Sequence, residues 1–180
     1  MSRRANRAVF LDRDGVLNRP LMIDGKPHPP ASVADLVILP DVLPSLLDLK
    51  RADFLLVVAT NQPDVARGTL AREAVEAIHA RLRAELPLDD ILTCYHDDSD
   101  RCDCRKPLPG LLCQASRKYG LDLSSCFLVG DRWRDIDAGN HAGCRSILID
   151  YGYRERRPER QPAARVHCLR EAVDWILEHK

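Results

Sequence analysis

Short apolar runs alternate along the chain with longer segments in which apolar residues recur every three or four positions. The short runs are strand-sized and rich in branched and aromatic residues, which is typical of buried strands. They cover residues 9–11, 54–59, 91–93, 127–129 and 145–149. The longer segments predict helices over 41–51, 69–86, 109–119 and 169–179, and between the last two strands. This alternation predicts an α/β fold whose mainly parallel sheet is covered by helices on both faces.

Two segments interrupt the alternation. Residues 19–40 are Pro-rich, polar and broken, so we expect no regular element there. Residues 151–165 are rich in Arg, Pro and Glu, which predicts a mobile surface loop. Asp41 and Thr69 stand before apolar helical patterns and are expected to begin those helices, and Gly120 is expected to end the helix before it.

Composition narrows the class of protein. With 180 residues the chain has room for one good core, so a single domain over 1–180 is expected. The chain has 27 basic and 27 acidic residues, so no net charge attracts it to nucleic acid or to a membrane surface. The apolar runs are too short to span a bilayer, and the Arg-rich start (residues 2–7) lacks the apolar stretch of a signal peptide. We therefore expect a cytoplasmic monomer.

The first apolar run ends in two aspartates, Asp12 and Asp14, followed by Gly15. Carboxylates at the carboxyl end of a strand stand where open α/β sheets bind their ligands. Two carboxylates this close repel each other unless a cation or a shared proton reduces the repulsion. Mg²⁺, bound together with a substrate phosphate, meets this requirement. Taken alone, the segment is equally well read as an ordinary acidic turn.

Four motifs together resemble the haloacid dehalogenase superfamily. The stretch from Asp12 to Asn18 resembles its nucleophile loop, and the later matches follow in the order that the superfamily requires. These later matches are Thr60-Asn61-Gln62, Arg105-Lys106-Pro107 and Gly130-Asp131-Arg132-Trp133-Arg134-Asp135. The resemblance implies a phosphatase with a Rossmann-like three-layer α/β/α sandwich that works through an aspartyl-phosphate. The gaps after the first and third strands are too short for a separate cap domain.

The resemblance also implies a role for each matching residue. Asp12 is the expected nucleophile and Asp14 the expected general acid and base. The Mg²⁺ is expected at Asp12, Asp131 and the backbone carbonyl of Asp14. Thr60 is expected to bind the phosphoryl group and Lys106 to supply positive charge. The expected substrate-binding residues are Arg13, Asn61, Gln62, Arg105 and Arg132, and Asp135 either holds metal-bound water or orients Lys106.

Four of the residues between positions 94 and 104 have the spacing of a zinc site. Cys94, His96, Cys102 and Cys104 offer four soft or borderline ligands, as structural zinc requires. Buried cysteines would be the alternative, but the acidic residues around them do not suit a core. The odd total of seven cysteines also argues against a disulfide framework. We expect a structural Zn²⁺ in a zinc-binding loop.

The cysteine motif resembles the zinc loop of the subgroup that holds D-glycero-D-manno-heptose 1,7-bisphosphate phosphatases and histidinol-phosphate phosphatases. The expected reaction is hydrolysis of the C7 phosphate of heptose 1,7-bisphosphate, a small phosphorylated molecule. Histidinol phosphate or another phosphomonoester is the alternative substrate. A third possibility is a zinc-binding interaction module with a vestigial site, against which the intact motifs argue. Pro63 departs from the pattern because it lacks a donor N–H.

Overall fold

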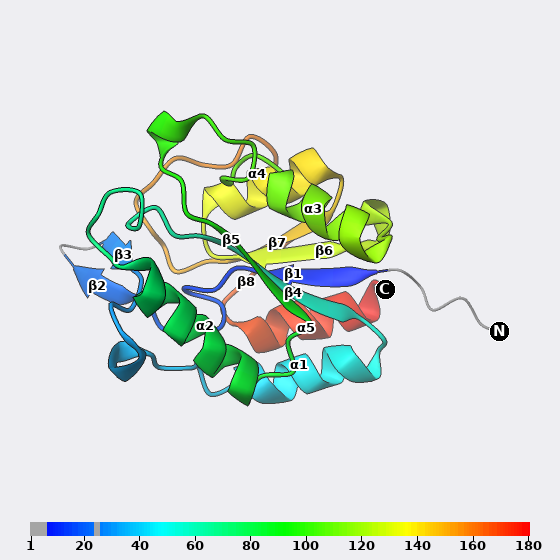
Figure 1. The fold of residues 1–180 in the computed structure, drawn as a ribbon. Helices are drawn as coiled ribbons and strands as arrows, with labels where there is room; N and C mark the ends of the chain where they lie inside the picture. The colour runs from blue at the N-terminus through cyan, green and yellow to red at the C-terminus, as the bar shows by residue number, and fades with distance from the viewer. Residues whose placement is uncertain (1–6, 24–25) are drawn as a thin grey trace.

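The computed structural model describes residues 7–23 and 26–180, and a six-stranded parallel sheet forms its middle layer (Figure 1). The strand order is β5-β4-β1-β6-β7-β8, and every pairing between neighbours is parallel. The strands are β1 (Ala8–Leu11), β4 (Leu55–Asn61), β5 (Asp90–Cys94), β6 (Phe127–Gly130), β7 (Arg145–Ile149) and β8 (Ala164–Val166). The predicted sheet is therefore confirmed, with one strand more than the sequence indicated.

Helices cover both faces of this sheet, as the alternation predicted (Figure 1). One face carries α1 (Val42–Arg51), α2 (Arg72–Glu85) and α5 (Leu169–Glu178); the other carries α3 (Gly110–Tyr119) and α4 (Trp133–Ala142). Alternate residues of β1 serve the two cores: Val9 and Leu11 pack on the first, Ala8 and Phe10 on the second. Such two-sided burial explains why the strands are apolar throughout.

The strand order brings three strand ends together. β1 lies in the middle, with β4 on one side and β6 on the other, and Leu11 pairs with both Val58 and Val129. The chain runs outward through β4 and β5, then crosses to the far side of β1 to form β6. Ligands of open α/β sheets bind at the carboxyl ends of strands where the order reverses in this way. Asp12, Thr60 and Asp131 all fall at this edge.

Two predicted irregular segments contain short strands. Residues 19–40 hold the antiparallel hairpin of β2 (Leu21–Ile23) and β3 (Lys26–His28), followed by a single 3-10 turn, η1 (Val33–Asp35). The segment 151–165 runs into β8, which pairs with β7 at the sheet edge. Strands of three residues are too short to show an alternating pattern, so periodicity could not reveal them.

Two helix starts differ from the sequence prediction. Asp41 precedes α1 but makes no capping bond; its Oδ2 accepts the N–H of Arg170 at 3.0 Å and joins α1 to α5. The second helix begins at Arg72, because the N–H groups of Thr69 and Leu70 bond to the carbonyl of Asp64 in a turn. Gly120 ends α3 in the left-handed region, as predicted.

The ends of the sheet strands carry more of the site than expected. β4 extends through Thr60 and Asn61, and β5 includes Cys94. Among the described residues, the segment between β1 and α1 holds the hairpin and η1, and the segment between β5 and α3 holds the cysteine loop, so neither contains a separate cap domain. The Arg-rich start at residues 2–6 lies outside that part. None of the helices there is long and apolar enough to cross a membrane.

Candidate active site

Three aspartates meet at the carboxyl edge of the sheet. Asp12 follows β1, Asp131 follows β6, and Asp135 lies in the first turn of α4. One carboxylate oxygen from each lies within 4.8 Å of the other two. Asp131 and Asp135 are buried, and only 13% of the Asp12 side chain is exposed. Three carboxylates in this space repel one another strongly unless cations compensate them.

Lys106 supplies one such cation from the loop after the cysteine cluster. Its Nζ donates to Asp12 Oδ1 at 2.9 Å, to Asp135 Oδ1 at 2.5 Å and to the carbonyl of Ala59 at 2.7 Å. The side chain is 2% exposed, and burial lowers its pKa. The carboxylates of Asp12 and Asp135 outweigh that effect and hold the pKa of Lys106 above its ordinary value. Lys106 therefore stays charged, and Asp135 orients it.

One lysine does not balance three carboxylates. Burial raises the pKa of Asp12 to about 6, with Asp135 adding to the shift and Lys106 opposing it. Burial and the neighbouring Asp12 and Asp135 raise the pKa of Asp131 well above its ordinary value. Within the described residues, the buried Asp131 Oδ1 has no hydrogen-bond partner. An unpartnered oxygen among hard carboxylate donors fits a divalent cation such as Mg²⁺.

Gly15 makes room for this cluster. Its φ of +84° lies in the left-handed region, and a Cβ added there would stand 2.1 Å from Asp131 Oδ2. The hydroxyl of Tyr151 donates to the Gly15 carbonyl at 2.9 Å, so the loop after β7 is tied to the same turn. A residue without a side chain is therefore needed at this position of the nucleophile loop, where it packs against Asp131.

Asp14 lines the cavity, and hydrogen bonds from three neighbouring side chains hold its carboxylate in place. Arg13 donates to both carboxylate oxygens at 2.9–3.2 Å, and Asn18 and Gln62 donate at 3.0 and 2.9 Å. Burial raises the pKa of Asp14, but these donors outweigh it and leave the pKa below its ordinary value. Burial and Arg13 lower the pKa of His79 to about 4, so its neutral Nε2 accepts from Arg13 at 3.1 Å.

These contacts correct two expectations. Arg13 is 0% exposed and Gln62 is 1% exposed, and neither lines the cavity, so neither is placed to bind substrate directly. Both instead position Asp14, because a buried guanidinium and amide need partners for their donors. Sequence reasoning missed His79, whose only signal was a histidine within the apolar face of α2 beside Ile78 and Leu82.

The second motif joins the site to the loop that carries Lys106. Asn61 Nδ2 donates to the carbonyl of Lys106 at 3.0 Å, and the N–H of Lys106 donates to Asn61 Oδ1 at 3.1 Å. Gln62 Nε2 also donates to Thr60 Oγ1 at 2.9 Å, which leaves the hydroxyl hydrogen of Thr60 free for another acceptor. Asn61 lines the cavity, whereas Thr60 is buried and does not line it.

The four predicted zinc ligands come together. Cys94, His96, Cys102 and Cys104 each place a ligand atom within 4.8 Å of the other three. The Sγ atoms of Cys94 and Cys102 are 3.7 Å apart, and His96 Nδ1 is 3.3 Å from Cys104 Sγ. Two zinc–sulfur bonds of about 2.3 Å at a tetrahedral angle place their sulfurs about 3.8 Å apart. The Cys102–Cys104 sulfurs, 3.5 Å apart, are also close to this value, whereas those of Cys94 and Cys104, 2.9 Å apart, must separate to bind one ion. Three cysteines and a histidine gathered in this way form a donor set that fits a four-ligand zinc site.

The cysteine loop also holds Arg105. Nε of Arg105 donates to Asp98 Oδ1 at 2.8 Å, and Nη1 donates to the carbonyl of His96 at 3.3 Å. Arg134 from α4 reaches the same Asp98 at 3.4 Å. Because the partners of Arg105 belong to the loop that the cysteines close, the loop sets the position of the guanidinium.

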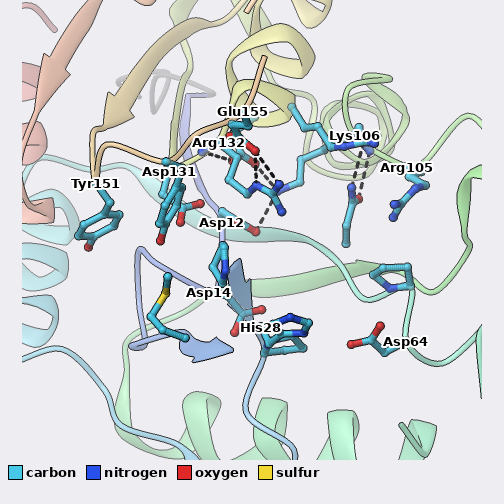
Figure 2. A pocket seen from close by; sticks show the side chains of 18 of the residues that line it. Asp12, Asp14, His28, Asp64, Arg105, Lys106, Asp131, Arg132, Tyr151 and Glu155 are labelled. Atoms are coloured by element: carbon cyan, nitrogen blue, oxygen red, sulfur yellow. Dashed lines mark hydrogen bonds and ion pairs between the residues drawn. The ribbon is translucent and has the colours of Figure 1, made fainter. Parts of the chain in front are cut away.

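A cavity of about 1,020 Å³ opens above the aspartates (Figure 2). Asp12, Asp14, Lys106 and Asp131 line it where it meets the carboxyl edge of the sheet, which we call its floor. Its walls come from the hairpin, from the segment between β4 and α2, from the cysteine loop with α4, and from the loop after β7. They include Met22, His28, Asp64, Arg105, Arg132, Arg134, Tyr151 and Glu155. The hairpin, Asp64 and Arg67 between β4 and α2, and the loop after β7 are the parts that the sequence did not assign to the site.

Arg132 has an ion-pair partner inside this cavity. Its Nε and Nη2 donate to Glu155 Oε2 at 2.9 and 2.6 Å, and the N–H of Trp133 donates to Glu155 Oε1 at 3.3 Å (Figure 2). The backbone N–H of Arg132 donates to Asp135 Oδ2 at 3.1 Å. Arg132 thus lines the cavity as expected, but a carboxylate already neutralises its charge.

Comparison with known proteins identifies the family of the chain. A family model described as HAD-hydrolase-like matches residues 103–173. The D-glycero-beta-D-manno-heptose-1,7-bisphosphate 7-phosphatase of Pseudomonas aeruginosa is 37% identical over 150 residues, 80% of this chain and 81% of that protein. The protein of the same name from Bordetella bronchiseptica is 36% identical over 151 residues, 81% of this chain and 82% of that protein.

The same relationship holds for the fold. The crystal structure of D,D-heptose 1,7-bisphosphate phosphatase from B. bronchiseptica, complexed with magnesium and phosphate, matches with a TM-score of 0.82. The two chains are 32% identical, and the match covers 97% of this chain and 99% of that one. The chain therefore belongs to the haloacid dehalogenase superfamily of hydrolases, in the family of the D-glycero-D-manno-heptose-1,7-bisphosphate phosphatases.

Proposed function

We propose that the chain is a Mg²⁺-dependent phosphatase that removes the C7 phosphate of D-glycero-D-manno-heptose 1,7-bisphosphate. The observation that carries this is the Asp12 carboxylate, which lies on the cavity floor beside a buried, charged Lys106. The names of the relatives supply the substrate. We also propose that residues 1–180 work as one domain, because both core clusters pack on the same sheet.

The carboxylates of Asp12 and Asp131 and the backbone carbonyl of Asp14 would hold the Mg²⁺. When bound, the ion supplies positive charge to the oxygens of the transferred phosphoryl group. The unpartnered Oδ1 of Asp131 supports this assignment. Both oxygens of Asp135 already accept protein donors, from Lys106 and from the N–H of Arg132, so Asp135 serves to position Lys106.

In the first step, a carboxylate oxygen of Asp12 attacks phosphorus and the bond from phosphorus to the sugar oxygen breaks. Lys106 lines the cavity and is placed to stabilise the charge on the phosphoryl oxygens. Thr60 does not line the cavity, and its proposed contribution is the free hydroxyl hydrogen that it offers from the end of β4. Asp14 gives its proton to the leaving sugar oxygen. Because the donors around Asp14 favour its ionised form, the negative phosphate that enters the cavity is what raises its pKa enough to carry that proton.

In the second step, a water molecule attacks the phosphorus of the aspartyl-phosphate. Asp14, now a carboxylate, takes a proton from this water, and the bond from phosphorus to Asp12 breaks. The products are inorganic phosphate and the free Asp12 carboxylate. The fixed contacts of Asp14 with Arg13 and Gln62 keep it in the same place for both proton transfers.

We propose that Zn²⁺ at Cys94, His96, Cys102 and Cys104 is structural. All four positions of a tetrahedral ion would be filled by protein, which leaves none for water or substrate. Its contribution to catalysis would be indirect, through the carbonyl of His96 and the side chain of Asp98, which hold Arg105 at the cavity wall.

Asp12→Asn is expected to reduce turnover of any phosphate ester below about one per cent of the wild-type value, because an amide does not attack phosphorus. Phosphate release measures the activity. Circular dichroism confirms that the variant is folded, and Asp174→Asn, at an exposed position on α5, is the control that keeps activity. Turnover above that level would exclude Asp12 as the nucleophile.

Gly15→Ala is expected to weaken Mg²⁺ binding, because the added Cβ displaces the carboxylate of Asp131. Gly143→Ala is the matched control, since its φ of +85° carries the same left-handed strain but no atom lies within 4 Å. Both variants should lose about 1–2 kcal/mol of unfolding free energy from that strain. Titration calorimetry with Mg²⁺ should separate them, and equal affinities would contradict the proposed role of Asp131.

Cys102→Ser is expected to lower zinc content, thermal stability and activity together. Protein purified without added metal should contain about one zinc per chain by elemental analysis. A loss of about 2 kcal/mol lowers Tm by roughly 4–8 °C in a chain of this size. Cys113→Ser, outside the cluster, is the control. An unchanged Tm in Cys102→Ser, or wild-type protein without zinc, would refute the zinc assignment.

Arg105→Ala is expected to lower kcat/KM for heptose 1,7-bisphosphate roughly tenfold to hundredfold, the cost of a lost charge-assisted hydrogen bond. An aryl phosphate has no second phosphate for Arg105, so its turnover should fall much less. Arg105→Lys keeps the charge without the planar fork and should recover part of the loss. An equal loss with both substrates would place Arg105 in the chemistry or in the cysteine loop instead.

A further inference from the structure

The arginines of the cavity are held in two different ways. Arg105 and Arg134 pair with Asp98, and Arg105 also lies 3.6 Å from Asp97. Neither aspartate lines the cavity. These carboxylates therefore lie behind the guanidinium groups and leave the cavity side of Arg105 and Arg134 available to an anion.

Arg132 differs because its partner stands inside the cavity. Glu155 lines the same space, its side chain is 18% exposed, and it binds Arg132 through two hydrogen bonds (Figure 2). The N–H of Trp133 fixes its other oxygen. The carboxylate is thus held on this wall by the start of α4, beside Asp131 on the floor.

A fixed carboxylate at this place selects between chemical groups. A phosphate that approaches Arg132 also approaches Glu155, and like charges brought together across an interface are strongly disfavoured. A sugar hydroxyl is accepted there, because an ionised carboxylate takes hydrogen bonds and cannot give them. The wall of Arg105 and Arg134 has the opposite preference.

We propose that Glu155 is a specificity-determining residue that fixes which face of the sugar meets each wall. The inference rests on the proposed function: with the C7 phosphate at Asp12, the C1 phosphate must lie toward Arg105 and Arg134. The two anomers project this phosphate from opposite faces of the ring. Glu155 therefore rejects the anomer whose C1 phosphate points toward Arg132, and Arg132 serves to position Glu155.

Glu155→Gln tests this inference, because it removes the charge but keeps the size and one acceptor. We expect kcat/KM for the disfavoured anomer of heptose 1,7-bisphosphate to rise about tenfold, mainly through KM, since Arg132 becomes free to bind its C1 phosphate. The favoured anomer should change less than twofold. Glu159→Gln, on the same loop but outside the cavity, should leave the ratio of the two anomers unchanged.

An equal change for both anomers would overturn the inference, because Glu155 would then only hold the loop in place. An unchanged ratio of the two kcat/KM values would overturn it as well.

Failure of the proposed function looks different, because the wild-type chain would then hydrolyse neither anomer. In that case, inhibition of aryl phosphate turnover tests Glu155 directly. Glu155→Gln should lower the inhibition constant of glucose 1,6-bisphosphate at least fivefold and leave that of glucose 6-phosphate unchanged, and equal shifts would refute it.

Discussion

The ion pairs of Lys106 are the constraint on which the rest of the site depends. A buried ammonium is tolerated only when its charge and its three donors are satisfied, and here Asp12, Asp135 and the carbonyl of Ala59 satisfy them. These partners come from β1, α4 and β4, and Asn61 fixes the backbone of Lys106 from both sides. One side chain therefore joins the nucleophile strand, its neighbour in the sheet, the helix after β6 and the loop that follows the cysteines. A shift of any of these elements costs the buried ammonium a hydrogen-bond partner, so their positions depend on one another before any ligand arrives.

Charge balance then decides what the cavity accepts. The floor remains short of positive charge, as the raised pKa values of Asp12 and Asp131 show. With Lys106 charged, the three carboxylates leave a net charge of two minus, which repels a phosphate, and a bound divalent ion would cancel that charge. Metal and phosphate therefore favour each other's binding at this floor. Asp14 lies outside that exchange in the free protein, because Arg13 compensates it and His79 stays neutral beside Arg13.

The sequence was sufficient to predict the helices and strands with strong hydrophobic patterns and to locate the site residues at strand ends. A parallel sheet needs apolar strands, and the strand ends of such a sheet converge, so Asp12, Thr60 and Asp131 could be placed together before the structure was known. The hairpin and β8 could not be found, since three residues carry no period. Side-chain direction was also out of reach. Arg13 stands between two site residues, yet it points into the protein because a buried histidine and the Asp14 carboxylate take its donors.

The same limit explains why specificity was harder to predict than chemistry. The reacting residues are fixed by the sheet, whose geometry follows from local patterns. The residues that meet the rest of the substrate come from segments with little regular structure, namely the hairpin, the cysteine loop and the loop after β7. Whether an arginine there is free for substrate depends on where its carboxylate partner lies. Asp98 binds Arg105 from outside the cavity and leaves its cavity side open. Glu155 lies inside the cavity and pairs with Arg132 there. Two arginines that each stand next to a site residue in their motif thus have different roles, and the difference depends on contacts between residues 7 and 23 positions apart.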